Sequence, residues 1–477
     1  MHRGLLLAAL PLAGCAQLFG IDTTTGPGAG SGVSLSIERV SIGAAITKAP
    51  QDLSMDTASF LVGDATGLTP NAAIVSAPGV WTADLATGTP PALFTLPDLP
   101  MGAQHLWALP SRAMKGNLYA YEHPNATAPS MTSQLSLSVT IPAYASEQLE
   151  VYAVGAWMRH VLVGAEVPAA AATMITATIP YTSFSPTAGN PAARITLADV
   201  VLVLRYTGAT LSGVLQATPF DQTDGTDNIG GSMVAVAADK TLSIPLPTDL
   251  ATRYSAVRPA VGAVASSWSV VAAPGETIGV SAGVPLLSGA PAATDTMVTG
   301  MYGDPFESLG WPAVFTLSTS ASRTYMLMAT PVTLGAALNT AVDTNATAAP
   351  LDAGLPTTIL LGTTQLNTDG LTVTVDPSTP VDVSFLADKS SNTLYTATIY
   401  ELVLSGATYD RKPVVAAAAA PDPKFLFPAG TLQSGHTYVI QAGCLQGGFT
   451  GAATGDLQTR SFPLSHGSLD SGVFTVQ

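Results

Sequence analysis

Apolar and polar residues alternate along most of this chain. The alternation is clear in residues 33–38, 135–141, 371–375 and 381–385. A period of two is that of a β-strand with one buried face. No stretch of about a dozen residues has the 3.6-residue period and the capping residues of a helix. Thr, Val, Gly and Pro also abound where a helix would need Glu, Lys and Leu. The pattern therefore predicts an all-β fold.

The length of the chain predicts several domains rather than one. The chain has 477 residues, and a β-sandwich of the immunoglobulin type needs about 100. Segments of low complexity are the natural boundaries between such units. Tryptophans are scattered singly along the chain, which favours one core anchor in each unit over a clustered sugar-stacking platform. We expect tandem β-sandwiches at 33–130 (one unit), 131–275 (one or two units), 276–360 (a sandwich or partial module) and 361–477 (one unit).

The last predicted unit has the most specific pattern. It contains about seven strand candidates, the number found in immunoglobulin-like sandwiches. Residues 432–438 place a Gly ahead of Tyr438 and resemble a tyrosine corner, in which the Tyr hydroxyl bonds to upstream backbone. Together these features resemble the fibronectin type III family. Phe385 stands where that family usually has an early-strand Trp, so the resemblance is incomplete.

The N-terminus carries a second resemblance. Arg3 precedes an apolar run that ends in Leu-Ala-Gly-Cys at residues 12–15. Charge, apolar run and small residues occur in the order of a bacterial lipobox. The resemblance implies that residues 1–14 are a lipoprotein signal peptide and that the Cys15 thiol carries a diacylglyceryl group of palmitate-type chains. Residues 15–32 are rich in Gly and would form a flexible tether.

The same resemblance implies a location. The residue after Cys15 is Ala16 rather than Asp, which in bacterial lipoproteins favours the outer membrane. The expected location is therefore the bacterial cell envelope, lipid-anchored at the outer membrane, on its periplasmic face or at the cell surface. The alternative is that Cys15 is an ordinary small apolar residue in a secretory leader or a buried N-terminal helix.

Charge narrows the range of partners. The chain has 17 Lys and Arg against 32 Asp and Glu, a net charge of −15. An acidic surface repels phosphate backbones, so nucleic acid is not an expected partner. The expected partners are a membrane, through acyl chains on Cys15, and a protein or glycan ligand. Cys444 has no second cysteine to pair with if Cys15 is acylated, and we interpret it as a buried, inert thiol.

One loop is a candidate calcium site. Asp221, Asp224, Asp227 and Asn228 gather oxygen ligands around a Gly, and Ca²⁺ prefers six to eight oxygens. The spacing fits neither an EF-hand nor a glycine-rich nonapeptide repeat. A solvated hairpin loop without metal is the alternative. No other cofactor is expected, and the 6 histidines show no zinc-site spacing.

Catalysis is not expected from the sequence. Residues 279–283 match the Gly-X-Ser-X-Gly pattern around Ser281, but Val-Pro-Leu follows where a nucleophile elbow needs a helix. We therefore expect a non-catalytic cell-envelope lipoprotein that presents β-sandwich modules for protein or glycan binding or adhesion. The alternatives are a lipid-anchored envelope hydrolase with a loop-borne active site and a structural subunit of an envelope complex.

Overall fold

The computed structural model describes most of the chain. The described residues are 32–43, 46–50, 52, 59–64, 67–72, 74–84, 92–96, 105–108, 115–121, 123, 125, 127–187, 192–274, 283–292, 295–345, 352–419, 422–449, 456–457 and 460–477. Strands make up nearly all of the regular structure, so the predicted all-β fold is confirmed. The helical segments are short: α2 (Leu250–Ala256), η1 (Gly164–Glu166), η2 (Tyr181–Ser183) and η3 (Glu307–Leu309).

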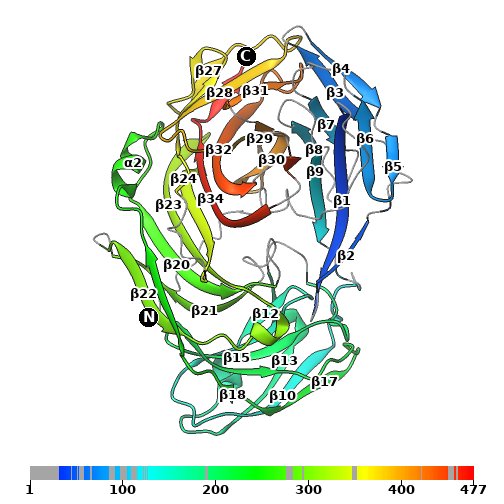
Figure 1. The fold of residues 1–477 in the computed structure, drawn as a ribbon, viewed down its shortest axis with the longest axis vertical. Helices are drawn as coiled ribbons and strands as arrows, with labels where there is room; N and C mark the ends of the chain where they lie inside the picture. The colour runs from blue at the N-terminus through cyan, green and yellow to red at the C-terminus, as the bar shows by residue number, and fades with distance from the viewer. Residues whose placement is uncertain are drawn as a thin grey trace.

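One long ladder of paired strands runs through the molecule, and Figure 1 shows it as an arc from the bottom, up the left side, to the upper right. Its strands are, in spatial order, β14 (Ser185–Pro186), β12 (Met158–Val161), β11 (Gln148–Ala153), β15 (Val201–Thr207), β16 (Thr210–Gln216), β21 (Val284–Gly289), β20 (Ala265–Ala272), β23 (Ala313–Leu327), β24 (Thr330–Asp343), β34 (Arg460–Asp470), β32 (Thr437–Phe449), β29 (Leu394–Ser405), β30 (Thr408–Ala419), β8 (His105–Ala108), β7 (Ala92–Leu96), β3 (Ser59–Asp64) and β4 (Gly67–Ala72). Three further short strands extend it: β18 (Val234–Ala235) pairs with β16, and β35 (Phe474–Val476) pairs with both β32 and β27 (Leu371–Val373).

A separate N-terminal sheet lies on the right of Figure 1. Its strands are β33 (Asp456–Leu457), β9 (Lys115–Tyr121), β1 (Gly32–Ile42), β6 (Val80–Asp84) and β5 (Ile74–Ala77), with β2 (Ile46–Pro50) paired to β1. β1 covers the first predicted strand. Trp81 is only 1% exposed, as expected of a core anchor. Val40 and Ile42, near the end of β1, pack into the core of the middle of the chain.

The middle of the chain holds two cores. In the first, the sheet β13 (Met174–Pro180), β10 (Gln134–Thr140), β17 (Thr226–Ser232) packs on β11, β12 and β15. Leu135, Leu137 and Val139 of β10 point inward, as their alternation predicted. In the second, the two-stranded sheet β19 (Lys240–Pro245), β22 (Met297–Tyr302) covers β20, β21 and β23.

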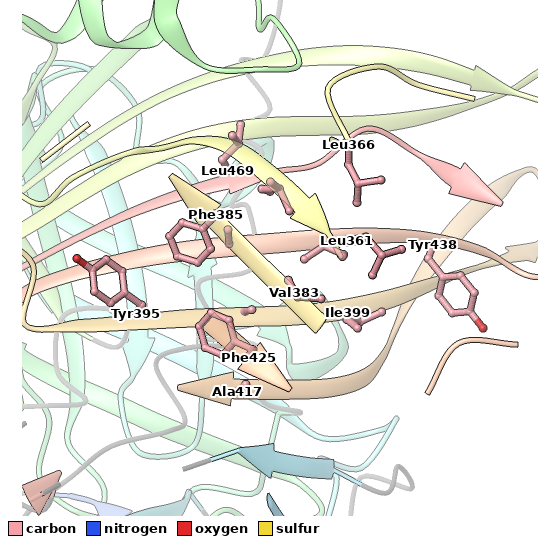
Figure 2. Close-up of a cluster of buried hydrophobic side chains, with 14 of the residues drawn as sticks. Leu361, Leu366, Val383, Phe385, Tyr395, Ile399, Ala417, Phe425, Tyr438 and Leu469 are labelled. Atoms are coloured by element: carbon pink, nitrogen blue, oxygen red, sulfur yellow. The ribbon is translucent and has the colours of Figure 1, made fainter. Parts of the chain in front are cut away.

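The C-terminal core lies between two sheets, with its buried side chains shown in Figure 2. One sheet is β26 (Thr364–Gln365), β25 (Pro356–Leu361), β28 (Val381–Ala387), β31 (Lys424–Phe427). The facing strands run β30, β29, β32, β34. The order β25–β28–β31 against β30–β29–β32–β34 is typical of immunoglobulin-like sandwiches.

The predicted tyrosine corner is confirmed in this sandwich. The Gln433 N–H donates to the Tyr438 hydroxyl at 2.9 Å, at the crossover from β31 to β32. Gly435 has φ of 82°, a left-handed backbone that glycine adopts without strain. Phe385, the residue in place of the family's Trp, is buried and stacks on Phe425 with ring centroids 6.1 Å apart.

Strand pairing crosses the divisions predicted at residues 275 and 360. β19 pairs with β22 across the first, and β24 pairs with β34 across the second. The C-terminal core also includes Tyr254 from α2 and Leu338 from β24. The units are therefore joined into one continuous ladder. None of the helices in the described ranges is long and apolar enough to span a bilayer.

Candidate functional site

A pocket of ≈ 290 Å³ opens where β19, β22 and η3 meet the start of β23 and the end of β24. It is lined by Lys240, Asp304, Glu307, Gly310, Trp311, Pro312, Ala313, Thr344 and Asn345. The pairing of β19 with β22 places Lys240 directly opposite Tyr302, at the end of that two-stranded sheet. The pocket is thus built from residues that are far apart in the sequence.

The chain between β22 and β23 forms the floor of the pocket. A side chain at Gly303 would place its Cβ 2.1 Å from the Ala237 carbonyl oxygen, so only glycine permits this close approach. The Asp304 carboxylate accepts the Phe306 N–H at 3.0 Å and starts the turn into η3. Trp311 then folds back and stacks on Phe306, with ring centroids 5.5 Å apart. These contacts fix the floor before any ligand binds.

The rim of the pocket carries charges of both signs. The Lys240 ammonium donates to the Glu307 carboxylate in an ion pair whose side chains are 30% and 66% exposed. This bond raises the pKa of Lys240, which therefore remains a cation. Burial raises the pKa of the Asp304 carboxyl above its ordinary value.

Neutral groups lie beside these charges, with Thr344 and Asn345 on the lining and Tyr302 buried behind it. The Tyr302 hydroxyl donates to the Thr344 hydroxyl at 3.1 Å, and Thr344 in turn donates to the Ala313 carbonyl at 3.0 Å. Burial raises the pKa of Tyr302, so the phenol keeps its proton at neutral pH. The backbone N–H of Asn345 donates a hydrogen bond to the Asp343 carboxylate. Asn345 itself is exposed at the edge of the pocket.

This arrangement is suited to recognition by hydrogen bonds. It offers an ammonium, two carboxyls and an amide to a polar ligand. The Trp311 side chain is only 3% exposed, so it supports the floor rather than presenting a stacking surface. The lining contains no His, Cys or Ser that could act as a nucleophile or as an imidazole base.

Of the four candidate calcium ligands, the three Asp side chains bond to other protein groups, and the Asn side chain points away from the buried Asp. Asp221 accepts the Leu197 N–H at 2.9 Å, and Asp224 pairs with Arg194. Asp227 is buried, accepting the Tyr181 hydroxyl at 3.0 Å and the Thr223 hydroxyl at 2.8 Å. Asn228 follows Asp227 in β17 and points to the opposite, exposed face.

These contacts satisfy the carboxylates without an ion. No group of three or more His, Cys, Asp or Glu side chains in the described ranges could hold a metal. The calcium hypothesis therefore gains no support from the positions of Asp221, Asp224, Asp227 and Asn228.

In the described ranges, three histidines have a ring nitrogen within hydrogen-bond distance of a carboxylate. The pairs are His123 with Asp199 (2.8 Å), His160 with Glu166 (2.8 Å) and His436 with Glu401 (2.7 Å). His436 belongs to the tyrosine corner and stacks on Tyr438. The predicted burial of Cys444 is confirmed: its side chain is 0% exposed, and burial raises the pKa of its thiol well above the usual range.

Some predicted features lie outside the described residues. They are the signal peptide, Cys15 and most of the tether, together with Ser281 of the Gly-X-Ser-X-Gly pattern. The chain matches no protein-family model and no curated protein.

Sequence reasoning did not identify the pocket. Its residues lie between positions 240 and 345 and converge only because β19 pairs with β22 and β23 with β24. A local signal existed in Asp304 and Glu307, two acids that flank Phe306 beside a Gly and a Trp. That cluster has no motif spacing that distinguishes it from an ordinary polar loop.

Proposed function

We propose that this chain is a non-catalytic cell-envelope lipoprotein that presents β-sandwich modules for binding a protein or a glycan. Its acyl-bearing residue would be Cys15, followed by a Gly-rich tether and the strand ladder. The pocket between β22 and β23 would be the ligand site.

The observation that carries this proposal is the chemistry of the pocket rim. Lys240, Glu307 and Asn345 combine donors and acceptors of the kind that hydroxyls and amides recognise. All three side chains reach solvent, so they can exchange their present partners for a ligand. The pre-formed floor at Trp311 lowers the ordering cost of binding.

The proposed anchor is supported by the sequence at residues 12–15. Each methylene buried in a bilayer contributes about 0.8 kcal/mol, and two or more acyl chains give stable attachment. Attachment through lipid also suits a chain with a net charge of −15, which gains nothing from anionic headgroups.

The ligand site is tested with a glycan array and a panel of envelope peptides, followed by titration of the best ligand. Glu307→Gln keeps the shape of the rim but removes its charge, so we expect binding to weaken by about tenfold or more. Asp410→Asn removes an exposed charge on β30, outside the pocket, and should leave affinity unchanged. Equal affinity of the Glu307→Gln variant and the parent chain would exclude the pocket as the ligand site.

The anchor is tested by labelling cells with radioactive palmitate. The parent chain should incorporate label and fractionate with membranes, whereas Cys15→Ser should do neither. A Cys15→Ser chain that still fractionates with membranes would refute the acyl anchor.

One observation favours a hydrolase as the second candidate. Burial raises the pKa of Asp304, and the carboxyl groups of Asp304 and Glu307 line the same pocket. Two carboxyl groups on one pocket, one of them with a raised pKa, are the arrangement used in glycoside hydrolysis. Turnover of any glycoside by the purified chain, abolished by Asp304→Asn, would establish this second candidate in place of the first.

A further inference from the structure

Two hairpin turns lie at the same edge of the strand ladder. β24 begins at the turn that follows β23, and β30 begins at the turn that follows β29. The ladder leads from β24 through β34, β32 and β29 to β30, and each of these four pairings is antiparallel. β24 and β30 therefore run in the same direction, and their turns project from the same edge.

Both hairpins extend beyond the strands between them. The last pair between β24 and β34 is Ala336 with Leu469, so residues 330–335 of β24 continue past β34. The last pair between β29 and β32 is Glu401 with Tyr438, so residues 402–405 continue past β32. At about 3.3 Å per residue, the first extension is about 20 Å long.

The two extensions are braced against each other. The Arg411 guanidinium on β30 donates to the Thr333 carbonyl on β24 at 2.7 Å and to the Asp470 carboxylate at 2.9 Å. Beneath this contact a small core contains Val332, Leu334, Leu402, Val439 and Val473. The hairpins therefore form a rigid, paired projection.

The tips of this projection are apolar and uncharged. Met326 is 55% exposed, Met328 is 87% exposed and Leu404 is 56% exposed. Residues 324–335 and 402–409 contain no Asp, Glu, Lys, Arg or His. Behind the tips, Tyr325, Tyr400 and Tyr409 are half-buried against the small core.

The turn between β23 and β24 is strained for its sequence. Met328 has φ of 46° and Ala329 has φ of 69°, where a two-residue hairpin turn normally has Asn or Gly. Met328 is also almost fully exposed, so this side chain adds nothing to the core. An exposed apolar residue in a strained turn indicates a role outside the folded chain.

We propose that the paired hairpin tips, defined by Met326, Met328 and Leu404, dock into the interfacial layer of a phospholipid bilayer. Met and Leu side chains would enter the acyl region, and the tyrosines behind them would sit at the headgroup level, where amphipathic rings are favoured. The absence of charge from both tips removes the main cost of insertion.

A second copy of the chain is a poorer occupant. A stable interface buries about 800 Å² on each partner, and three exposed side chains on narrow tips offer far less. A bilayer needs no such area if the chain is already held beside it. That last point rests on the proposed acyl anchor at Cys15, because a short flexible tether would hold the tips at millimolar effective concentration near the membrane.

The test places an environment-sensitive fluorophore on the full chain at Met328→Cys and mixes the chain with phosphatidylcholine vesicles. We expect a blue shift and quenching by spin-labelled acyl chains. The control is Met131→Cys, at a position that is 82% exposed in the turn before β10, where neither effect should occur. In a Cys15→Ser background, Leu404→Asp should lower the vesicle partition coefficient by about tenfold or more.

The outcomes separate the two proposals. Absence of quenching at position 328, or equal quenching at 131, would overturn the docking surface even if palmitate labels Cys15. Quenching at 328 without palmitate incorporation would retain the docking surface and remove the anchor. If Leu404→Asp changes the oligomeric mass in light scattering rather than vesicle binding, the tips are an interface between copies and the proposal fails.

Discussion

The charged groups at α2 and those at the pocket differ in how the fold holds them. Arg253 on α2 is 6% exposed, and its guanidinium donates to Asp388 at 2.7 Å, to the Ala353 carbonyl at 2.6 Å and also to Asp352. Lys240 at the pocket has the Glu307 carboxylate as its ion-pair partner, on an exposed rim. The first set joins α2 to the C-terminal core through four hydrogen bonds from one buried guanidinium. The second can exchange its partner, which is why we assign binding to the pocket.

Removing the buried cation should give the largest effect. Arg253→Ala leaves the Asp388 and Asp352 carboxylates without their shared partner, so we expect the free energy of unfolding to fall by about 3–5 kcal/mol. Denaturant titration measures this loss. The control is Arg194→Ala, because Arg194 pairs with an Asp224 side chain that is 69% exposed, and such a pair contributes no more than about 1 kcal/mol. Similar losses in the free energy of unfolding for Arg253→Ala and Arg194→Ala would show that the buried cation at α2 is no more important for stability than an exposed ion pair.

The buried contact between His123 and Asp199 adds a second test of how buried charged groups contribute to stability, because its contribution should depend on pH. Burial alone would lower the pKa of His123, but the hydrogen bond and charge of Asp199 outweigh it and raise the pKa above its ordinary value of 6.5. A raised folded-state pKa means that this contribution to stability is complete below pH 6.5 and is lost as pH rises through the folded pKa.

We therefore expect the free energy of unfolding to decline above pH 6.5, by at most about 1.4 kcal/mol per pH unit. His123→Gln should remove the decline that is due to His123. Denaturant titrations at a series of pH values measure the free energy of unfolding of the two chains. An identical pH profile in the His123→Gln variant would show that the pair does not couple protonation to folding.

The smallest expected effect on stability is at the pocket. Lys240→Met breaks an exposed ion pair while keeping the length of the side chain, so the free energy of unfolding should change by less than about 1 kcal/mol. Binding of the ligand identified by array should nevertheless weaken, because the ammonium is lost. A large loss of stability with unchanged binding would make Lys240 a structural residue like Arg253.

Local patterns in the sequence predict many of the strands and the tyrosine corner. Alternation at residues 135–141 and 381–385 predicted strands that are present as β10 and β28. The crossover at Tyr438 was predicted because a tyrosine corner needs only a few adjacent residues. Such features are set by the period of a strand and by turn chemistry, both of which are local.

The pairing of distant strands could not be predicted in this way. Nothing in residues 330–343 or 460–470 indicates that β24 and β34 lie side by side, because any strand with one apolar face can pair with any other. The pocket depends on the same long-range pairing, so its residues were not recognised together. The acidic loop illustrates the opposite error: Asp227 and Asn228 are adjacent in sequence, yet β17 turns them to opposite faces.

Mass spectrometry of the mature N-terminal peptide tests the proposed function most directly. If the chain is an anchored envelope lipoprotein, the peptide begins at Cys15 and carries the mass of a diacylglyceryl group. A peptide that begins upstream of Cys15, or a Cys15 thiol without added mass, would contradict it.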